Sequence, residues 1–179
     1  MVLAATGTSK SFTFKAINPG LLVYHCATPM VAQHISNGMH GMHGMILIEP
    51  EGGLPRVDRE FYAMQDELYT AQSLVTPGEI EFPLEKLLKE QPGHMMFNGT
   101  VDALTRTHRV QAKVGETVCI FFGVGGPHAT SSFHMIGEVF DRAHSVADLT
   151  SPPLWSIQTI SVPPGGASMV EFKVEVPGR

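Results

Sequence analysis

The stretch LLVYHCATPMVAQHISNGM, residues 21–39, carries the side chains on which the interpretation of this chain depends. An apolar run of strand type ends in a histidine and a cysteine side by side, His25 and Cys26. A second histidine and a methionine follow, His34 and Met39, which gives the spacing Cys-x7-His-x4-Met. Blue-copper sites combine one cysteine and two histidines with a weak axial methionine. The stretch therefore predicts a type 1 copper site on a loop that follows a strand.

The neighbouring histidine has two possible roles. Adjacent residues of a strand point to opposite faces, so if Cys26 faces the interior of a β-sandwich, His25 faces outward. There His25 is either an ordinary surface residue or a ligand of a second metal. In the second case one peptide unit would link an electron-entry centre to a catalytic centre.

Composition and strand spacing favour an all-β chain. Its 179 residues include 18 glycines and 13 prolines, which favour many turns. One helical turn is expected over 84–90, where leucines share a face. Strands are expected over 11–17, 21–26, 44–50, 59–70, 94–101, 108–114, 116–124, 131–140, 156–162 and 167–176. Many short strands with almost no helix indicate a Greek-key sandwich or a barrel.

Charge and hydropathy exclude some function classes. The net charge is −5 and the basic residues are scattered, so nothing suggests nucleic acid or an anionic membrane as a partner. No apolar run is long enough to cross a bilayer, and the first residues lack the pattern of a signal peptide. Cys119 lies in an apolar strand-like run, and we expect a buried, inert thiol there.

The run YHCATPMVAQHISNGM resembles the copper-containing nitrite reductases, which are trimeric, NO-forming enzymes built of two cupredoxin domains. Multicopper oxidases, their main relatives, usually carry His-Cys-His at this point, whereas Ala27 follows Cys26 here. The resemblance covers nearly the whole chain through the further segments LIEPEGGLPRVDREFYAMQDELYT, FNGTVDALT, VGETVCIFFGVGGPHATSSFHMIGEVFD and TISVPPGGASMVEFKVEVPG. It implies an all-β fold of tandem cupredoxin-like Greek-key sandwiches.

Both sandwiches are expected to be incomplete in this chain. The first block holds about three strands, too few for a sandwich of about seven, and the chain stops at a Pro-Gly pair that normally introduces another strand. We therefore expect a fragment cut at both ends. Residues 1–57 would be the C-terminal part of a first cupredoxin domain, 58–93 an interdomain segment, and 94–179 a second domain without its last strands. Several metal ligands of the family would lie outside such a fragment, which alone should be inactive.

The resemblance also implies roles for individual residues. Cys26, His34 and Met39 match type 1 copper ligands, and His25 matches one of three histidines of a type 2 copper. His134 matches a second-domain histidine that stands over the type 2 copper of a neighbouring subunit and takes part in proton delivery. A further match is Ile136, which corresponds to an apolar residue that crowds the substrate pocket.

The implied function is copper-dependent reduction of nitrite to nitric oxide, a one-electron, two-proton step of denitrification. An electron from a small cupredoxin or a cytochrome would enter at the type 1 copper and pass through Cys26 and His25 to the type 2 copper. The family is homotrimeric and works in the periplasm or on the outer cell surface. Two alternatives are a blue-copper electron-transfer protein and a multicopper oxidase.

One departure from the family pattern concerns the axial ligand. The triplet Gly-Met-His occurs twice, at 38–40 and 41–43. Slippage duplication explains this repeat, and extra metal binding by His40 and His43 is the alternative. The spacing from His34 favours Met39 as the axial ligand, although Met42 or Met45 could compete.

Overall fold

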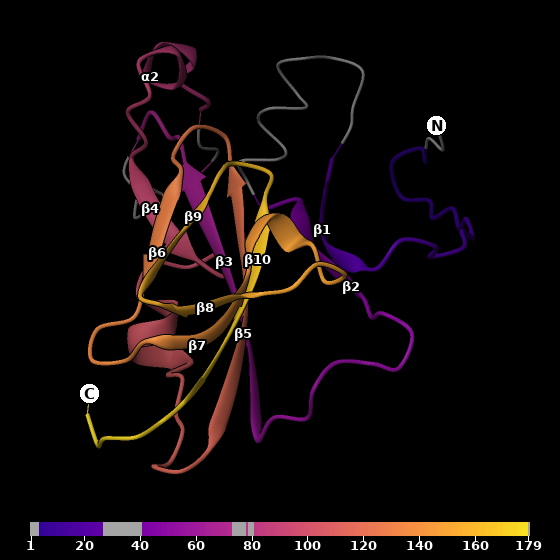
Figure 1. Ribbon diagram of the computed structural model, residues 1–179. Helices are drawn as coiled ribbons and strands as arrows, with labels where there is room; N and C mark the ends of the chain where they lie inside the picture. The colour runs from indigo at the N-terminus through magenta and orange to yellow at the C-terminus, as the bar shows by residue number, and fades with distance from the viewer. Residues whose placement is uncertain (1–3, 27–40, 73–77, 79–80, 179) are drawn as a thin grey trace.

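The computed structural model describes residues 4–26, 41–72, 78 and 81–178 (Figure 1). Two of the expected copper ligands, His34 and Met39, lie outside the described residues. The described strands are β1 (Gly20–His25), β2 (His43–Ile48), β3 (Arg59–Leu68), β4 (His94–Phe97), β5 (Thr117–Gly126), β6 (Ser131–His134), β7 (Phe140–His144), β8 (Leu154–Ile157), β9 (Thr159–Val162) and β10 (Ala167–Lys173). The short helical segments are α2 (Leu84–Leu88), η1 (Ala103–Thr107) and η2 (Ser145–Ala147).

The strands form three sheets. A six-stranded sheet has the order β4-β3-β5-β10-β7-β8, and two-stranded sheets pair β1 with β2 and β6 with β9. Strands β3 and β5 run parallel, and all other described pairs are antiparallel. The expected all-β class is confirmed.

The six-stranded sheet has a small sheet on each face. Phe122 of β5 belongs to a buried cluster with Ile160 and Val162 of β9. The next residue back, Phe121, packs on the other face with Leu21 of β1. Because β5 is covered on both faces, its sequence is apolar at successive positions rather than at alternate ones.

Several element boundaries differ from those that the sequence predicts. Residues 11–17 and 108–114 form no strand, because an alternating pattern does not supply a partner strand. Phe12 and Phe14 are accordingly 70% and 61% exposed. The expected strand 131–140 is divided between β6 and β7 by a turn at Gly137, which has a φ of +89°.

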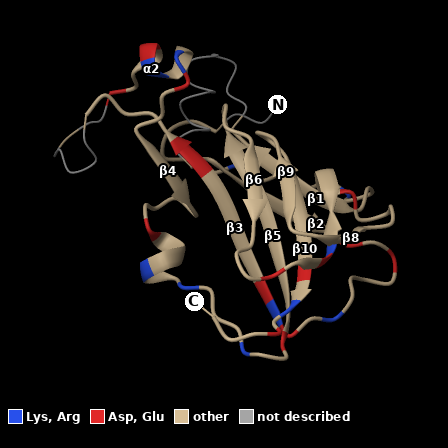
Figure 2. Cartoon of the chain, turned by 60° about the vertical axis from the view of Figure 1, so that its left-hand side comes forward, with Lys and Arg blue, Asp and Glu red and all other residues tan. Residues whose placement is uncertain are grey.

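Strand β3 lies inside the range 58–93, yet it is an inner strand of the six-stranded sheet, between β4 and β5. Figure 2 shows acidic segments at both of its ends. They comprise Glu60 at the start and the buried pair Asp66 and Glu67 at the end. The end of β3 therefore brings two carboxylates into the protein interior, where each needs polar partners.

Candidate metal centre

The β1–β2 hairpin positions the residues that the sequence analysis selects. Its antiparallel register pairs His25 with His43. The same register continues one residue further, because the amide of Cys26 donates to the carbonyl oxygen of Met42 at 2.9 Å. Cys26 and Met42 are therefore direct cross-strand neighbours.

The two faces of the hairpin have different surroundings. Leu21 is buried and Val23 is half-buried, and both pack toward the six-stranded sheet. Leu22, between them, points the other way and is 46% exposed. By the alternation of a strand, His25 falls on the face of Leu21, and Cys26 falls on the face of Leu22. His25 and Cys26 therefore point to opposite sides of the hairpin.

The His25 ring is held by the backbone of the next residue. Its Nδ1 lies 2.8 Å from the carbonyl oxygen of Cys26, and a carbonyl only accepts, so Nδ1 donates. In a neutral ring this leaves the lone pair on Nε2. Metal-binding histidines are usually oriented in this way, with the second ring nitrogen bonded to a carbonyl or a carboxylate.

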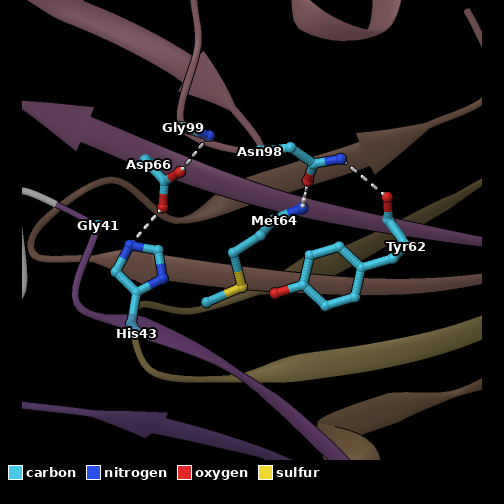
Figure 3. A pocket seen from close by; sticks show the side chains of 7 residues that line it. All are labelled: Gly41, His43, Tyr62, Met64, Asp66, Asn98 and Gly99. Atoms are coloured by element: carbon cyan, nitrogen blue, oxygen red, sulfur yellow. Dashed lines mark hydrogen bonds and ion pairs between the residues drawn. The ribbon is translucent and has the colours of Figure 1, made fainter. Parts of the chain in front are cut away.

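A buried pair that the sequence analysis did not predict joins Asp66 to His43 (Figure 3), and His43 is the cross-strand partner of His25. His43 Nε2 is 2.6 Å from Asp66 Oδ1, and the two side chains are 5% and 3% exposed. The other carboxylate oxygen of Asp66 accepts from the amide of Gly99 at 3.2 Å. Both side chains line a cavity of about 330 Å³ that Tyr62 also borders. The available signal was an acidic residue close to the apolar run of β3, residues 61–64.

The glycines of β5 make room for this pair. A Cβ at Gly125 would lie 2.7 Å from His43 Nε2 and 2.8 Å from Asp66 Oδ1. At Gly123 a Cβ would lie 2.5 Å from Met45 Sδ. The side chains of β2 therefore enter notches that only glycine leaves open.

The other two predicted site residues lie on a different sheet. His134 ends β6 and is exposed, and its Nδ1 is 2.9 Å from Thr159 Oγ1 on the paired strand β9. Ile136 follows β6 and is 90% exposed. Phe133, before His134, instead stacks on Phe122 with ring centroids 4.0 Å apart. Packing of Phe133 thus fixes the strand whose exposed side carries His134.

A second buried carboxylate has a structural role. Glu67 accepts from the Tyr69 hydroxyl at 2.8 Å and from the amide of His128 at 3.0 Å. Burial, followed by the contact with Glu67, raises the pKa of Tyr69 well above its usual range. His128 Nδ1 lies 3.0 Å from the same hydroxyl, so this partly exposed histidine is held by the same network.

The buried thiol of Cys119 is confirmed. Its residue is 2% exposed, and burial, followed by the nearby Glu171, raises its pKa to about 12. The thiol is therefore neutral near neutral pH, and a neutral thiol is a poor nucleophile and metal ligand.

The donor set of the hairpin suits copper. Thiolate and thioether are soft ligands that select copper, and imidazole binds it as well. Cys26 and Met42 supply the first two on one face, and His25 supplies an oriented imidazole on the other. Over residues 4–26, 41–72, 78 and 81–178, no group of three or more His, Cys, Asp or Glu side chains gathers to hold a metal. No helix in this part of the chain is long and apolar enough to cross a membrane.

This arrangement of sheets, with a histidine and a cysteine adjacent at a strand end, defines the class of copper proteins with the cupredoxin fold. No family model matches the chain. It is 44% identical over 174 residues to the copper-containing nitrite reductase of Neisseria meningitidis serogroup A, with 97% of this chain and 44% of that protein covered. Over these aligned residues, the chain is similar to copper-containing nitrite reductases.

Solved structures show the same similarity at the level of the fold. The copper nitrite reductase from Nitrosomonas europaea superposes with a TM-score of 0.76 at 30% identity, covering 98% of this chain and 60% of that one. A multicopper oxidase superposes with a TM-score of 0.69 at 23% identity, covering 92% and 50%, and shares the fold. The tandem cupredoxin class is therefore confirmed. The chain spans about 44% of the N. meningitidis relative, which agrees with the expectation that it is part of a longer protein.

Proposed function

We propose that a protein of the length of these relatives, here called the full-length enzyme, reduces nitrite to nitric oxide in a copper-dependent reaction. The reaction consumes one electron and two protons and releases water. The observation that carries this proposal is the adjacency of His25 and Cys26 at the end of β1, on opposite faces, in a homologue of copper-containing nitrite reductases. The described donors fit two copper centres that share one strand.

The ligands proposed for the two centres come from the family resemblance and from the division of His25 and Cys26 between two faces. The type 1 centre would use Cys26, His34 and a methionine of the Gly-Met-His repeat, for which sequence spacing favours Met39. The type 2 centre would use His25 through Nε2. Residues 1–57 would form part of a first cupredoxin domain and 94–179 part of a second, with β3 of the segment 58–93 added to the second sheet.

The chain itself would provide the route between the centres. Bound copper supplies one-electron and Lewis-acid chemistry at each site. The Cys26 side chain and one peptide unit join the thiol covalently to His25. The hydrogen bond from His25 Nδ1 to the Cys26 carbonyl oxygen, at 2.8 Å, adds a shorter second path. These contacts support electron transfer from the cysteine side of the hairpin to the histidine side.

His134 would handle a proton. Its Nδ1 is oriented by Thr159, so Nε2 can hold and release a proton toward a substrate that approaches the exposed side of β6. Imidazole is the side chain that most often acts as a general acid or base in proteins. The exposed side chain of Ile136 would restrict the same approach. By resemblance to the family, we propose that His134 and His25 meet between neighbouring subunits of a homotrimer.

The remaining partners and the location come from the family. The proposed electron donor is a small cupredoxin or a cytochrome. The proposed location is the periplasm or the outer cell surface, where the enzyme would serve denitrification. The rival functions are a simple blue-copper electron carrier and a multicopper oxidase, and Ala27 after Cys26 disfavours the oxidase.

The variant His25→Ala in the full-length enzyme tests the proposal. It should lose the type 2 copper signal in electron paramagnetic resonance and lose nitrite-dependent production of nitric oxide. It should keep the blue type 1 absorption, because Cys26 remains. Copper content per subunit should fall accordingly.

A matched control is His108→Ala, which removes another exposed histidine. It should keep both copper signals and normal turnover. Normal turnover of nitrite by His25→Ala would contradict the assigned role. If the unaltered enzyme carries a single blue copper and reduces no nitrite, the electron-carrier function holds instead, and oxygen consumption with a metal or phenol substrate would indicate an oxidase.

A further inference from the structure

The Gly-Met-His repeat has a second copy, residues 41–43, whose placement the structure describes. Each copy is followed by glycine, at Gly41 and at Gly44, so the sequence alone does not distinguish them. The second copy, residues 41–43, enters β2 and takes part in its register. Its contacts therefore show how Met42 lies relative to Cys26.

The histidine of the second copy is fixed by contacts with two other strands. His43 bonds Asp66 of β3 at 2.6 Å, and both side chains are almost fully buried. Gly125 of β5 leaves the notch in which this pair lies. Figure 3 shows the His43 ring directed from the hairpin toward Asp66. The pair thus fixes the position of residue 43 relative to the six-stranded sheet.

The glycine after the second copy is also specific. A Cβ at Gly44 would lie 2.6 Å from the hydroxyl oxygen of Tyr24, its cross-strand partner. The corresponding glycine of the first copy, Gly41, has a φ of +88° and nothing within 4 Å of an added Cβ. Tyr24 therefore packs over Gly44 and fixes the strand register next to residue 42.

These contacts determine where Met42 lies. Its carbonyl oxygen accepts from the amide of Cys26 at 2.9 Å. Directly opposed residues of an antiparallel pair share a face, with Cβ atoms about 5 Å apart. The Met42 side chain is 56% exposed, so the core does not hold its sulfur elsewhere.

Met45 is directed away from this face. It pairs with Val23 and packs in the cluster with Leu21, and its sulfur occupies the notch at Gly123. That cluster lies on the His25 side of the hairpin. Met45 is therefore excluded as a partner of the Cys26 thiol.

We infer that Met42 supplies the axial thioether of the type 1 copper and that the His43–Asp66 pair positions it opposite Cys26. This inference rests on the proposed type 1 site. It replaces the expected spacing with Cys-x7-His-x7-Met, so the repeat adds one triplet to the sequence between His34 and the methionine ligand. Met39 would then not be a ligand.

The test compares two methionine variants of the copper-loaded full-length enzyme, Met42→Gln and Met39→Gln. The readouts are the blue absorption, the type 1 electron paramagnetic resonance spectrum and the reduction potential. Met42→Gln should shift the spectrum and lower the potential, because an amide oxygen is a harder donor that favours Cu(II). Met42→Leu removes the donor and should raise the potential. Met39→Gln should leave all three readouts at the values of the unaltered enzyme.

The possible results distinguish failure of the Met42 inference from failure of the proposed function. A spectral shift in Met39→Gln equal to or larger than that in Met42→Gln overturns the inference, and so does an unaltered spectrum in both Met42 variants. Lack of a type 1 signal in the unaltered enzyme would instead overturn the proposed function. If Met42→Gln binds no copper, Met42→Leu and Met39→Gln still decide between the two methionines.

Discussion

Gly125 shows how a single missing side chain shapes the candidate site. Strand β5 carries no Cβ where His43 meets Asp66, and this allows an imidazole and a carboxylate to be buried between two sheets. Burial of such polar groups is costly, and the contact between His43 Nε2 and Asp66 Oδ1 offsets part of that cost. The space left by Gly125 therefore allows β2 to lie close to β5, with His43 against Asp66.

The variant Gly125→Ala should destabilise the protein. The new methyl carbon would lie under 3 Å from His43 and Asp66, whose buried ends have little room to move. Overpacking of this kind costs about 1–3 kcal/mol of unfolding free energy. Urea unfolding monitored by circular dichroism measures this loss of unfolding free energy. Gly178→Ala, with nothing near its Cβ, is the matched control, and equal stability of the two variants would contradict this role of Gly125.

At the scale of elements, β1 and β6 both alternate between packed and exposed side chains. Phe133 stacks between Phe122 and Phe140, with ring centroids 4.0 and 5.7 Å away, and His134 follows on the outer side. This stack attaches the β6–β9 sheet to the six-stranded sheet. The orientation of His134 thus depends on the ring next to it.

The variant Phe133→Ala should therefore weaken the attachment of β6. We expect a loss of about 3 kcal/mol, the lower end of the range for removal of a phenyl ring, because Phe133 is only partly buried. Ser132→Ala, which alters the exposed neighbour, should change stability by less than about 0.5 kcal/mol. Thermal and urea unfolding of both variants measure the difference. A loss for Ser132→Ala that matches the loss for Phe133→Ala would contradict this account.

Local patterns predicted much at this scale, and long-range packing explains the errors. The strand expected over 21–26 forms as β1, because strand formation there has a partner in β2. The alternation over 11–17 predicted a strand that does not form, since pairing depends on a partner. The His43–Asp66 contact joins residues far apart in the chain, so no local pattern contains it. Whether His34 completes the type 1 site stays a prediction.

At the scale of the molecule, the hairpin links two environments. One face of β1–β2 packs on the six-stranded sheet, and the other face presents Cys26 and Met42 beside exposed apolar side chains such as Leu22 and Tyr24. His25 lies on the packed face, and Cys26 lies on the exposed face. The whole account depends on this division of one strand end between two copper centres.

Anomalous diffraction at the copper absorption edge, from crystals of the copper-loaded full-length enzyme, tests that division most directly. The account predicts two separate copper peaks for each subunit. One should lie at bonding distance from the Cys26 thiol, and the other at bonding distance from His25 Nε2. A single copper bonded to both residues, or a second copper with no contact to His25, would contradict it.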